Sequence, residues 1–588
     1  MDGRSPPVSD SKIYSRGSVL TRLRGFFPLL LWLAPLTFLA LFYFYPLGRI
    51  LRLSLERSAQ GLLAPFLEAL NSTAIRNVLW FTIWQATVST LLTLLVGLPG
   101  AFLFARFEFR GKPLLQALTA IPFVMPTLVV AAAFNAFLGP RGWVNILFMS
   151  IFHFSAPPIQ FTNTIIAIFV AHVFYNTTIV LRLVGDFWSH LDPRLSQAAR
   201  TLGADRLQTF LRVTLPLLFP AIATAALLVF IFDFTSFGVI LILGGPHFAT
   251  LEVEIYYQTV SLFNLPLAAV LSVLQLASTL ILTVVYTRLS ERVSRPLRLR
   301  PRRFTQSRLA TWRSRMLAIL ILTLLLALLI TPLVSLAARS FLNLETRRGG
   351  QAVGNTGFTL DYYRELSINR RNSLFYVTPS TAIAISLGYA ITTVILALGL
   401  GLPAAWALVR DPGSPLNRAL DPILMLPLGT SAVTLGLGFI VALNRPPLDL
   451  RASPLLIPLA HTLVAFPFVV RSLAPALRSI QPKLRQAAAL LGASPREVLR
   501  YIDLPIGGRA IFVAATFAFT ISLGEFGATA LIARPEYPTI PIAIYRFLSQ
   551  PGALNYGQAL ALSTILMVVA AAGMLAIERF RIADVGEF

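Results

Sequence analysis

A 26-residue cassette occurs twice in this chain, once in each half. The first copy, residues 193–218, reads PRLSQAARTLGADRLQTFLRVTLPLL, and the second, residues 482–507, reads PKLRQAAALLGASPREVLRYIDLPIG. A constant offset of 289 residues pairs the proline, the Gln-Ala-Ala triplet, the glycine and the Leu-Pro pair of one copy with those of the other. Two copies of one polar segment predict a fold of two pseudo-symmetric halves.

The rest of the chain is very apolar. Hydrophobic residues make up 56% of its 588 residues and charged residues only 13%, which is more apolar surface than a soluble chain of this length can bury. Twelve apolar runs have the length of roughly 20 residues that a membrane-spanning helix needs. They lie near residues 28–48, 77–105, 115–137, 160–183, 218–243, 263–287, 315–336, 381–409, 421–443, 453–472, 508–531 and 559–577. We therefore predict an all-α integral membrane protein with about twelve transmembrane helices in two six-helix halves.

These runs and the repeat suggest how the chain is organised. Weaker repetition pairs His172 with His461 at the same offset, and Gly97-Leu98-Pro99 with Gly401-Leu402-Pro403 at an offset of 304. The expected segments are a basic leader at 1–27, a first half at 28–287 with its core near 77–287, a linker at 288–314, and a second half at 315–580 with its core near 381–577.

Basic residues predict the orientation in the membrane. Between Arg288 and Arg315 there are ten arginines and one acid, and the leader and the 106–112 loop are also basic. Because short Lys/Arg-rich loops stay in the cytoplasm, we expect both termini, the linker and both cassettes there, and residues 338–380 outside. The first apolar run is too long for a typical signal-peptide core, so we expect it to stay as an anchor. The net charge of +24 then reflects orientation and attraction to anionic lipid, not nucleic-acid binding.

Local signals predict two short helices in each cassette. Asp192-Pro193 is an N-cap followed by a first-turn proline, and Gly203 suits a left-handed helix stop. In the second copy, Ser494 begins the second short helix with Glu497 at the capping-box position. The two alanines after the glutamine are small enough for another protein to approach the backbone closely. One copy alone would suggest an elbow between two helices, whereas two matching copies favour a docking surface.

The cassettes resemble the cytoplasmic loop of permease subunits in type I ABC importers. That loop follows the pattern Glu-Ala-Ala, three residues, Gly, nine residues, Ile, one residue, Leu-Pro, and here Gln replaces Glu in both copies. The resemblance implies that each loop couples this chain to an ATP-hydrolysing subunit. The residues to which it gives this role are Gln197, Ala198, Ala199, Gly203, Leu215, Pro216, Gln486, Ala487, Ala488, Gly492, Leu504 and Pro505.

Two such loops in one chain resemble the fused permeases for ferric iron and for thiamine. In the first half, FTIWQATVSTLL, AHVFYNTTIVLRL and LGGPHFATLEVEIYYQ are similar to the thiamine type, and in the other half LGEFGATALI and PTIPIAIYRFL are similar to both types. The resemblance implies two copies of a cytoplasmic ABC ATPase, an extracytoplasmic solute-binding protein, and a multi-pass location in a bacterial or archaeal inner membrane. Related permeases serve sulfate and polyamines, so the cargo stays open.

The sequence does not contain the motifs of an ATPase or of another enzyme. It has no GxxxxGK[ST] phosphate loop, so we expect ATP to be used by the partner subunit and no cofactor to be bound by this chain. It has no cysteine, and its five histidines are scattered, so we interpret His172 and His461 as packing or pore-lining residues. The alternative is a 6+6 secondary transporter driven by an ion gradient, which the repeated coupling loop disfavours. A membrane enzyme would have only two buried acids to work with.

Those acids are Asp233 in the fifth predicted span and Glu525 in the eleventh. Charges in a bilayer are costly and usually face a cavity or a partner. The repeat pairs Asp233 with Ser522 and Glu525 with Ser236, so the acids lie about one helical turn out of step. They either hydrogen-bond neighbouring helices or lie on the translocation path and favour a cation in transit, a role that suits thiamine or iron better than sulfate.

Overall fold

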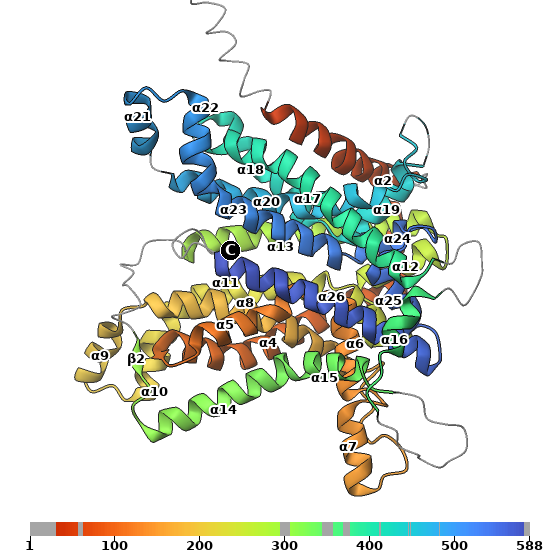
Figure 1. The fold of residues 1–588 in the computed structure, drawn as a ribbon, viewed down its shortest axis with the longest axis horizontal. Helices are drawn as coiled ribbons and strands as arrows, with labels where there is room; N and C mark the ends of the chain where they lie inside the picture. Colours follow the sequence, from red (N-terminus) through yellow and green to blue (C-terminus); the bar gives the residue numbers. More distant parts are fainter. Residues whose placement is uncertain are drawn as a thin grey trace, which may run out of the picture.

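The computed structural model describes residues 31–56, 61, 63–293, 306–343, 357–368, 377–410, 413–444, 446, 448–480 and 482–580. It is an elongated helical bundle (Figure 1). In the described part, ten helices are long and apolar enough to cross a membrane, and two bent pairs raise the number to twelve if each pair is one span. This is the predicted all-α membrane fold. The expected leader at 1–27 and residues 294–305 of the expected linker lie outside the described residues.

The first half has five unbroken spans. They are Leu31–Leu55, which includes η1 (Ala40–Phe44) and α2 (Tyr45–Leu55); α4 (Thr73–Arg106); α8 (Ile165–His190); Arg206–Phe234, made of α10 (Arg206–Thr209), η2 (Phe210–Thr214) and α11 (Leu215–Phe234); and α13 (Leu265–Val293). The shorter elements are α3 (Ala64–Asn71), β1 (Phe107–Glu108), α7 (Trp143–Phe152), α9 (Pro193–Thr201), η3 (Ile240–Gly244), η4 (Gly245–His247) and α12 (Leu251–Val260).

The second half repeats this plan. Its unbroken spans are α14 (Trp312–Leu329), which α15 (Thr331–Ser340) follows, α17 (Pro379–Arg410), α20 (Leu456–Ser479), α23 (Leu504–Gly524) and α26 (Ala553–Phe580). The shorter elements are β2 (Ser307–Arg308), α16 (Asp361–Arg364), η6 (Glu365–Ser367), α21 (Pro482–Leu490), α22 (Pro495–Val498), η8 (Leu499–Asp503), α24 (Gly527–Ile532) and α25 (Ile540–Leu548).

One span in each half is broken near its middle. In the first half, α5 (Lys112–Val124) is followed by α6 (Thr127–Leu138), and the segment Thr127–Phe152, which contains α6 and α7, is bent by 108° from α5. In the second half, α18 (Pro415–Met425) and η7 (Leu426–Gly429) meet α19 (Ala432–Ala442) at 95°. Pro126 at the first break and Pro427 in η7 lack the backbone N–H that would continue a helix. The apolar runs 115–137 and 421–443 are therefore bent pairs of helices, where the sequence predicted continuous spans.

A pair of repeated glycines lets the main helices of each half approach closely. A Cβ at Gly97 of α4 would lie 2.7 Å from Val180 Cβ of α8, and a Cβ at Gly401 of α17 would lie 2.5 Å from Val469 Cγ1 of α20. Val180 and Val469 are themselves partners in the repeat. Small residues at helix crossings allow backbone approach in membranes, which explains why the Gly-Leu-Pro triplet occurs twice.

The first span of each half lies against the opposite half. α2 packs on α13 of its own half and on α19 of the other, and the Tyr43 hydroxyl is 2.7 Å from Thr430 Oγ1. α15 likewise packs on α26 of its own half and on α6 of the first half, while α14 packs on α4. Figure 1 shows α2 beside α19, and α14–α15 beside α4 and α6. The two halves that are separate in sequence are thus interlocked in space.

Both cassettes lie at one end of the bundle. α9, α10, α21 and α22 project at the left of Figure 1, and α12, α16 and α25 lie toward the right. β1 pairs in parallel with β2 through Phe107↔Ser307 and Glu108↔Arg308. The basic 106–112 loop and the described end of the linker therefore meet at the cassette end.

Candidate functional site

The first cassette forms the two short helices that its sequence predicts. The Asp192 carboxylate accepts a hydrogen bond from Arg194 N at 3.0 Å and caps α9. Gly203 ends this helix with φ +94°, in the left-handed region that favours glycine. Asp205 then caps α10 by accepting from Gln208 N at 2.7 Å. Local capping chemistry thus fixes a compact helix–turn–helix outside the bundle.

The second cassette has the same form. Gly492 has φ +86° at the end of α21. Ser494 N donates to Glu497 Oε2 at 2.7 Å, and Glu497 N donates to Ser494 Oγ at 3.3 Å, which is the predicted capping box. Hydrogen bonding to Ser494, first to its backbone N–H and then to its hydroxyl, lowers the pKa of the Glu497 carboxyl. The carboxylate therefore stays charged and keeps the second short helix capped at neutral pH.

Matching residues of the two cassettes have matching exposure. Gln197, Ala198, Gln486 and Ala487 are exposed, whereas Ala199 and Ala488 are half-buried against their own loops. Gly203, Pro216, Gly492 and Pro505 are exposed and Leu215 is half-buried, while the Leu504 side chain lies outside the described set. The structure thus brings the predicted coupling residues to one end of the molecule as two similar surfaces.

Sequence reasoning missed the most exposed apolar residues of these loops. Leu202 is 88% exposed and its repeat partner Leu491 is 89% exposed. Both lie immediately before the glycine stop, so the turn holds them away from the bundle. An apolar residue directly before the repeated glycine was the signal in the sequence. In the second loop the preceding residue, Leu490, is also 89% exposed. Such exposed leucines are suited to filling an apolar pocket on a partner.

Different side-chain contacts hold the two cassettes in their folded form. In the second cassette, Arg485 Nε is 2.9 Å from Asp503 Oδ1, and the Asp503 side chain is only 6% exposed. The repeat partners in the first cassette are Ser196 and Thr214, whose hydroxyl oxygens are 3.4 Å apart. An ion pair with one buried partner is stronger than a long contact between hydroxyls. The second cassette is therefore the more firmly held.

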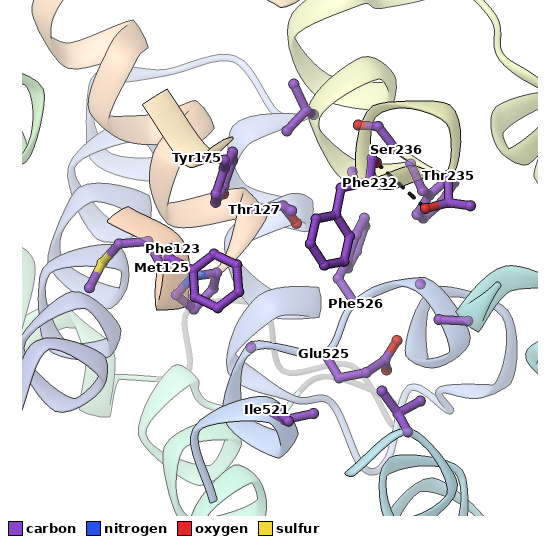
Figure 2. A pocket seen from close by; sticks show the side chains of 18 of the residues that line it. Phe123, Met125, Thr127, Tyr175, Phe232, Thr235, Ser236, Ile521, Glu525 and Phe526 are labelled. Carbon is purple, nitrogen blue, oxygen red and sulfur yellow. Dashed lines mark hydrogen bonds between the residues drawn. The ribbon is translucent and has the colours of Figure 1, made fainter. Parts of the chain in front are cut away.

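A cavity of about 420 Å³ lies between the two halves. It forms where both broken spans bend and where α11 and α23 end, so residues from the two halves line it together. Transporters place solute sites at such breaks, at the interface between repeats. The wall is largely aromatic, and Figure 2 shows the rings of Phe123, Phe232 and Phe526 gathered in it, with Tyr175 and Thr127 nearby.

His172 organises the polar side of this cavity in the first half. Its Nδ1 is 2.9 Å from Ser89 Oγ of α4, and its Nε2 is 2.9 Å from Ser236 Oγ just beyond α11. Asp233 Oδ1 is 3.4 Å from His172 Nδ1 and accepts a hydrogen bond from Asn176 Nδ2 at 2.7 Å. His172 therefore connects α8 with α4 and α11 and also lines the cavity; the sequence predicted a packing or pore-lining role for it.

His461 makes the corresponding contacts in the second half. Its Nδ1 is 2.8 Å from Ser522 Oγ of α23, and its Nε2 is 2.8 Å from Thr529 Oγ1 of α24. Glu525 Oε2 lies 3.2 Å from the same Nε2. Ala528 N donates to Glu525 Oε1 at 2.8 Å, and Thr529 donates to Oε2 through its backbone N–H and its hydroxyl. Both carboxylate oxygens of Glu525 thus have donors.

In each half an acid and a serine lie on opposite sides of the histidine ring, and their positions are reversed between the two halves. In the first half the acid, Asp233, is beside Nδ1 and Ser236 is beside Nε2; in the second half Ser522 is beside Nδ1 and Glu525 is beside Nε2. This explains the one-turn displacement seen in the sequence. Asp233 lies in α11 as predicted, whereas Glu525 follows the last residue of α23 and lies in the break before α24. The eleventh span therefore ends before the acid that the sequence placed inside it.

An aromatic cluster marks the pseudo-two-fold axis. Phe237 and its repeat partner Phe526 stack with ring centroids 5.5 Å apart. Each ring also contacts a tyrosine of its own half: Tyr256 is 5.3 Å from Phe237, and Tyr545, its repeat partner, is 5.5 Å from Phe526. Phe237 and Phe526 both line the cavity, so this stacked pair brings the two halves together in its wall.

Glu252 is a third acid at the cavity, and the sequence analysis did not predict it. Glu252 of α12 is fully buried and accepts hydrogen bonds from Gln275 Nε2 at 2.9 Å and from the Ser431 hydroxyl. Ser431 belongs to the second half, where it also caps α19, so Glu252 joins the two halves. Its repeat partner is Pro541, and for that reason the repeat gave no signal for it.

Comparison with known proteins places this architecture in a family. The family model described as "Binding-protein-dependent transport system inner membrane component" matches residues 97–295 and again 397–582. The thiamine transport system permease protein ThiP of Brucella suis biovar 1 is 28% identical over 540 residues, which covers 90% of this chain and 92% of that protein. ThiP of Escherichia coli K12 is 26% identical over 494 residues, 82% of this chain and 85% of that protein. The spermidine/putrescine permease PotB of Haemophilus influenzae is 30% identical over 223 residues, 38% of this chain and 78% of that protein.

The two matched segments contain one cassette each and together include most of both helical halves. The chain therefore belongs to the family of binding-protein-dependent transport system inner-membrane components, as an ABC importer permease in which two copies of the family domain are fused.

Proposed function

We propose that this chain is the complete transmembrane pathway of an importer for thiamine or a closely similar organic cation, driven by a separate pair of ATPase subunits. The observation that carries the ATPase partner is the matched geometry of the two cassettes. Each presents an exposed Gln-Ala pair and, directly before its glycine, a leucine that is almost fully exposed, at the same end of the bundle. Two equal surfaces suit two copies of one partner arranged about the same axis.

We assign one kind of partner to each end of the bundle. The basic 106–112 loop lies at the cassette end, where Arg308 of the linker pairs with it, so this end is assigned to the cytoplasm and to the ATPase subunits. The opposite end, with α12, α16 and α25, is assigned to the extracytoplasmic solute-binding protein. In this arrangement ATP binds to the partner subunits, and this chain needs no cofactor of its own.

The aromatic and acidic lining of the cavity and the descriptions of the relatives support thiamine as the transported solute. ThiP relatives match most of this chain and are described as thiamine permeases. An aromatic wall with a buried carboxylate attracts an organic cation through ring faces and charge. A polyamine is the second candidate, because PotB is described as a spermidine/putrescine permease and matches part of the chain.

Reconstitution tests this function directly. The chain would be placed in liposomes with its ATPase and binding protein, and uptake of radiolabelled thiamine would be measured with ATP, with a non-hydrolysable analogue, and with an ion gradient alone. Uptake that requires hydrolysis and all three proteins is the expected result. Uptake driven by the gradient without the ATPase would establish the secondary-transporter alternative. ATP-dependent uptake of putrescine but not of thiamine would assign the cargo to the polyamines.

A further inference from the structure

Two polar oxygen atoms at the cavity have no hydrogen-bond partner among the described residues. One is Oδ2 of Asp233, whose side chain is only 1% exposed, and the other is the hydroxyl of Tyr175. Both residues line the cavity. Burial of a polar group without a partner is unfavourable, and burial of a charge more so. A ligand that supplies a positive charge and a hydrogen-bond donor would satisfy both atoms.

These residues differ between the two sides of the pseudo-two-fold axis. The repeat partners of Tyr175, Asn176 and Asp233 are Val464, Ala465 and Ser522. The histidines that hold the helices together are present in both halves, so the fold does not require the additional polar groups. The two halves share a pseudo-symmetric fold, but their polar residues at the cavity differ. A ligand that is itself asymmetric would explain this difference.

Glu525 is excluded from the same role by its own hydrogen bonds. Its two oxygens accept from Ala528 N and from the backbone and hydroxyl of Thr529, and His461 Nε2 lies 3.2 Å away. These contacts cap α24 and fix the break that follows α23. A solute would have to displace them before it could reach the carboxylate. The two acids that the sequence treated alike therefore have different roles.

The chemistry of the wall selects the class of ligand. Seven phenylalanine and tyrosine side chains line the cavity, namely Phe123, Tyr175, Phe232, Phe237, Phe468, Phe517 and Phe526. Ring faces attract organic cations and stack on flat rings. A ferric ion would need several hard oxygen or nitrogen ligands together, and within the described residues no group of three or more His, Asp or Glu side chains forms such a set.

We propose that the cavity is a binding site for one flat organic cation, with Asp233 as its counter-ion and Tyr175 as a hydrogen-bond partner. The proposal rests on the import function above and makes it specific. Charge recognition takes place at the first half's wall, through Asp233 held by Asn176, and the aromatic side chains of both halves receive the ring. Glu525 holds the local fold and does not contact the solute.

Equilibrium binding tests this division of roles. The purified permease–ATPase complex without its binding protein would be titrated with radiolabelled thiamine as the probe, and with putrescine as a cation that has no ring. We expect Asp233→Asn to weaken thiamine binding about tenfold or more and Tyr175→Phe to weaken it several-fold. Asp233→Glu should restore part of the loss. Glu68→Gln, an exposed acid in α3, is the matched control and should bind like the wild type.

Each outcome decides one question. Equal thiamine affinity of the wild type and Asp233→Asn would overturn the counter-ion role, and a larger loss in Glu525→Gln than in Asp233→Asn would reverse the assignment of the two acids. Tighter binding of putrescine than of thiamine would overturn the role of the aromatic wall. A wild-type complex that imports thiamine with its binding protein, yet binds none without it, would refute the cavity site while leaving the import function intact. A lack of ATP-dependent uptake in the complete system would instead refute the import function.

Discussion

Asp233 and Glu525 are both buried acids at one cavity, yet their surroundings differ in the number of donors. Glu525 accepts three hydrogen bonds from α24 and lies beside His461. Asp233 accepts one side-chain hydrogen bond, from Asn176, through a single oxygen. A carboxylate with all its donors stabilises the local structure, whereas one with a free oxygen retains the capacity to bind. The number of hydrogen-bond donors therefore distinguishes Glu525, which stabilises the local fold, from Asp233, which we propose as the acid that binds the solute.

The structural role of Glu525 predicts a loss of stability on substitution. In Glu525→Gln, an amide NH₂ replaces one acceptor and faces the donors of α24, which should cost about 1–3 kcal/mol. Asp233→Asn keeps the oxygen that Asn176 contacts, so its cost should be smaller. Thermal unfolding of the purified protein in detergent measures both, with Glu68→Gln as the control. A Glu525→Gln variant as stable as the wild type would show that the cap contributes little.

At the scale of elements, two main helices of each half cross closely, and each half contains one cassette with capped short helices. Glycine at the crossing of α4 with α8, and of α17 with α20, brings valines into contact with the opposite backbone. The loops are set by their own caps and turn glycines, and the second is also held by Arg485 and Asp503. The crossing determines the packing within a half, and the caps determine the surface that each half offers to a partner.

The crossings predict a sharp dependence on side-chain size. Gly97→Ala and Gly401→Ala would place a methyl group less than 3 Å from a valine side chain, so each should destabilise its half by about 1–3 kcal/mol. Gly399→Ala is the matched control, because nothing lies within 4 Å of the added carbon in the same helix as Gly401. Unfolding temperatures in detergent compare the three variants. If the control loses as much stability as Gly401→Ala, the close crossing is not the cause.

The exposed loops predict contact with ATPase subunits, one loop to each. Ala199 and Ala488 have the matched spacing, but they are half-buried, so Ala198 and Ala487 are the better sites for a probe. Because the chain has no cysteine, Ala198→Cys and Ala487→Cys each introduce its only thiol. Each should cross-link to a cysteine in the ATPase groove at a Cα separation of roughly 4.4–6.8 Å. Cross-linking of the first variant alone, in every nucleotide state, would reduce the second loop to an elbow.

At the scale of the whole molecule, the first span of each half packs against the opposite half, and the stacked Phe237 and Phe526 rings lie on the axis between them. The helices α11 and α23 run from the cassettes to the cavity. Because rocking of such repeats about a fixed site is how transporters alternate access, we expect a displacement of either cassette to change the shape of the cavity.

The positions of the ends predict a topology that reporters can test. A reporter fused after Phe580, the last residue of α26, should be cytoplasmic, and one fused after Asn343, beyond α15, should be external. Alkaline phosphatase, active only outside, and a fluorescent protein, fluorescent only inside, report the two sides. Phosphatase activity at Phe580 would invert the arrangement and would remove the cassettes from the ATPase side.

The sequence by itself determined the features that depend on neighbouring residues. Apolar run length predicted the spans, the Asp192 and Ser494 caps predicted the short helices, and the repeat predicted two halves. Each of these follows from the backbone's own hydrogen bonds or from the apolar surface of a single helix, so a few adjacent residues carry the signal.

Only the tertiary structure decided which distant groups meet. The donors to Glu525 follow directly after it, but the break that exposes them depends on how α23 and α24 pack against α20 and α19. Asp233 receives Asn176 from another span, 57 residues away, and Glu252 receives Ser431 from the other half. Hydrogen bonds are short and directional, so the role of each buried acid depends on helix positions that no local pattern contains.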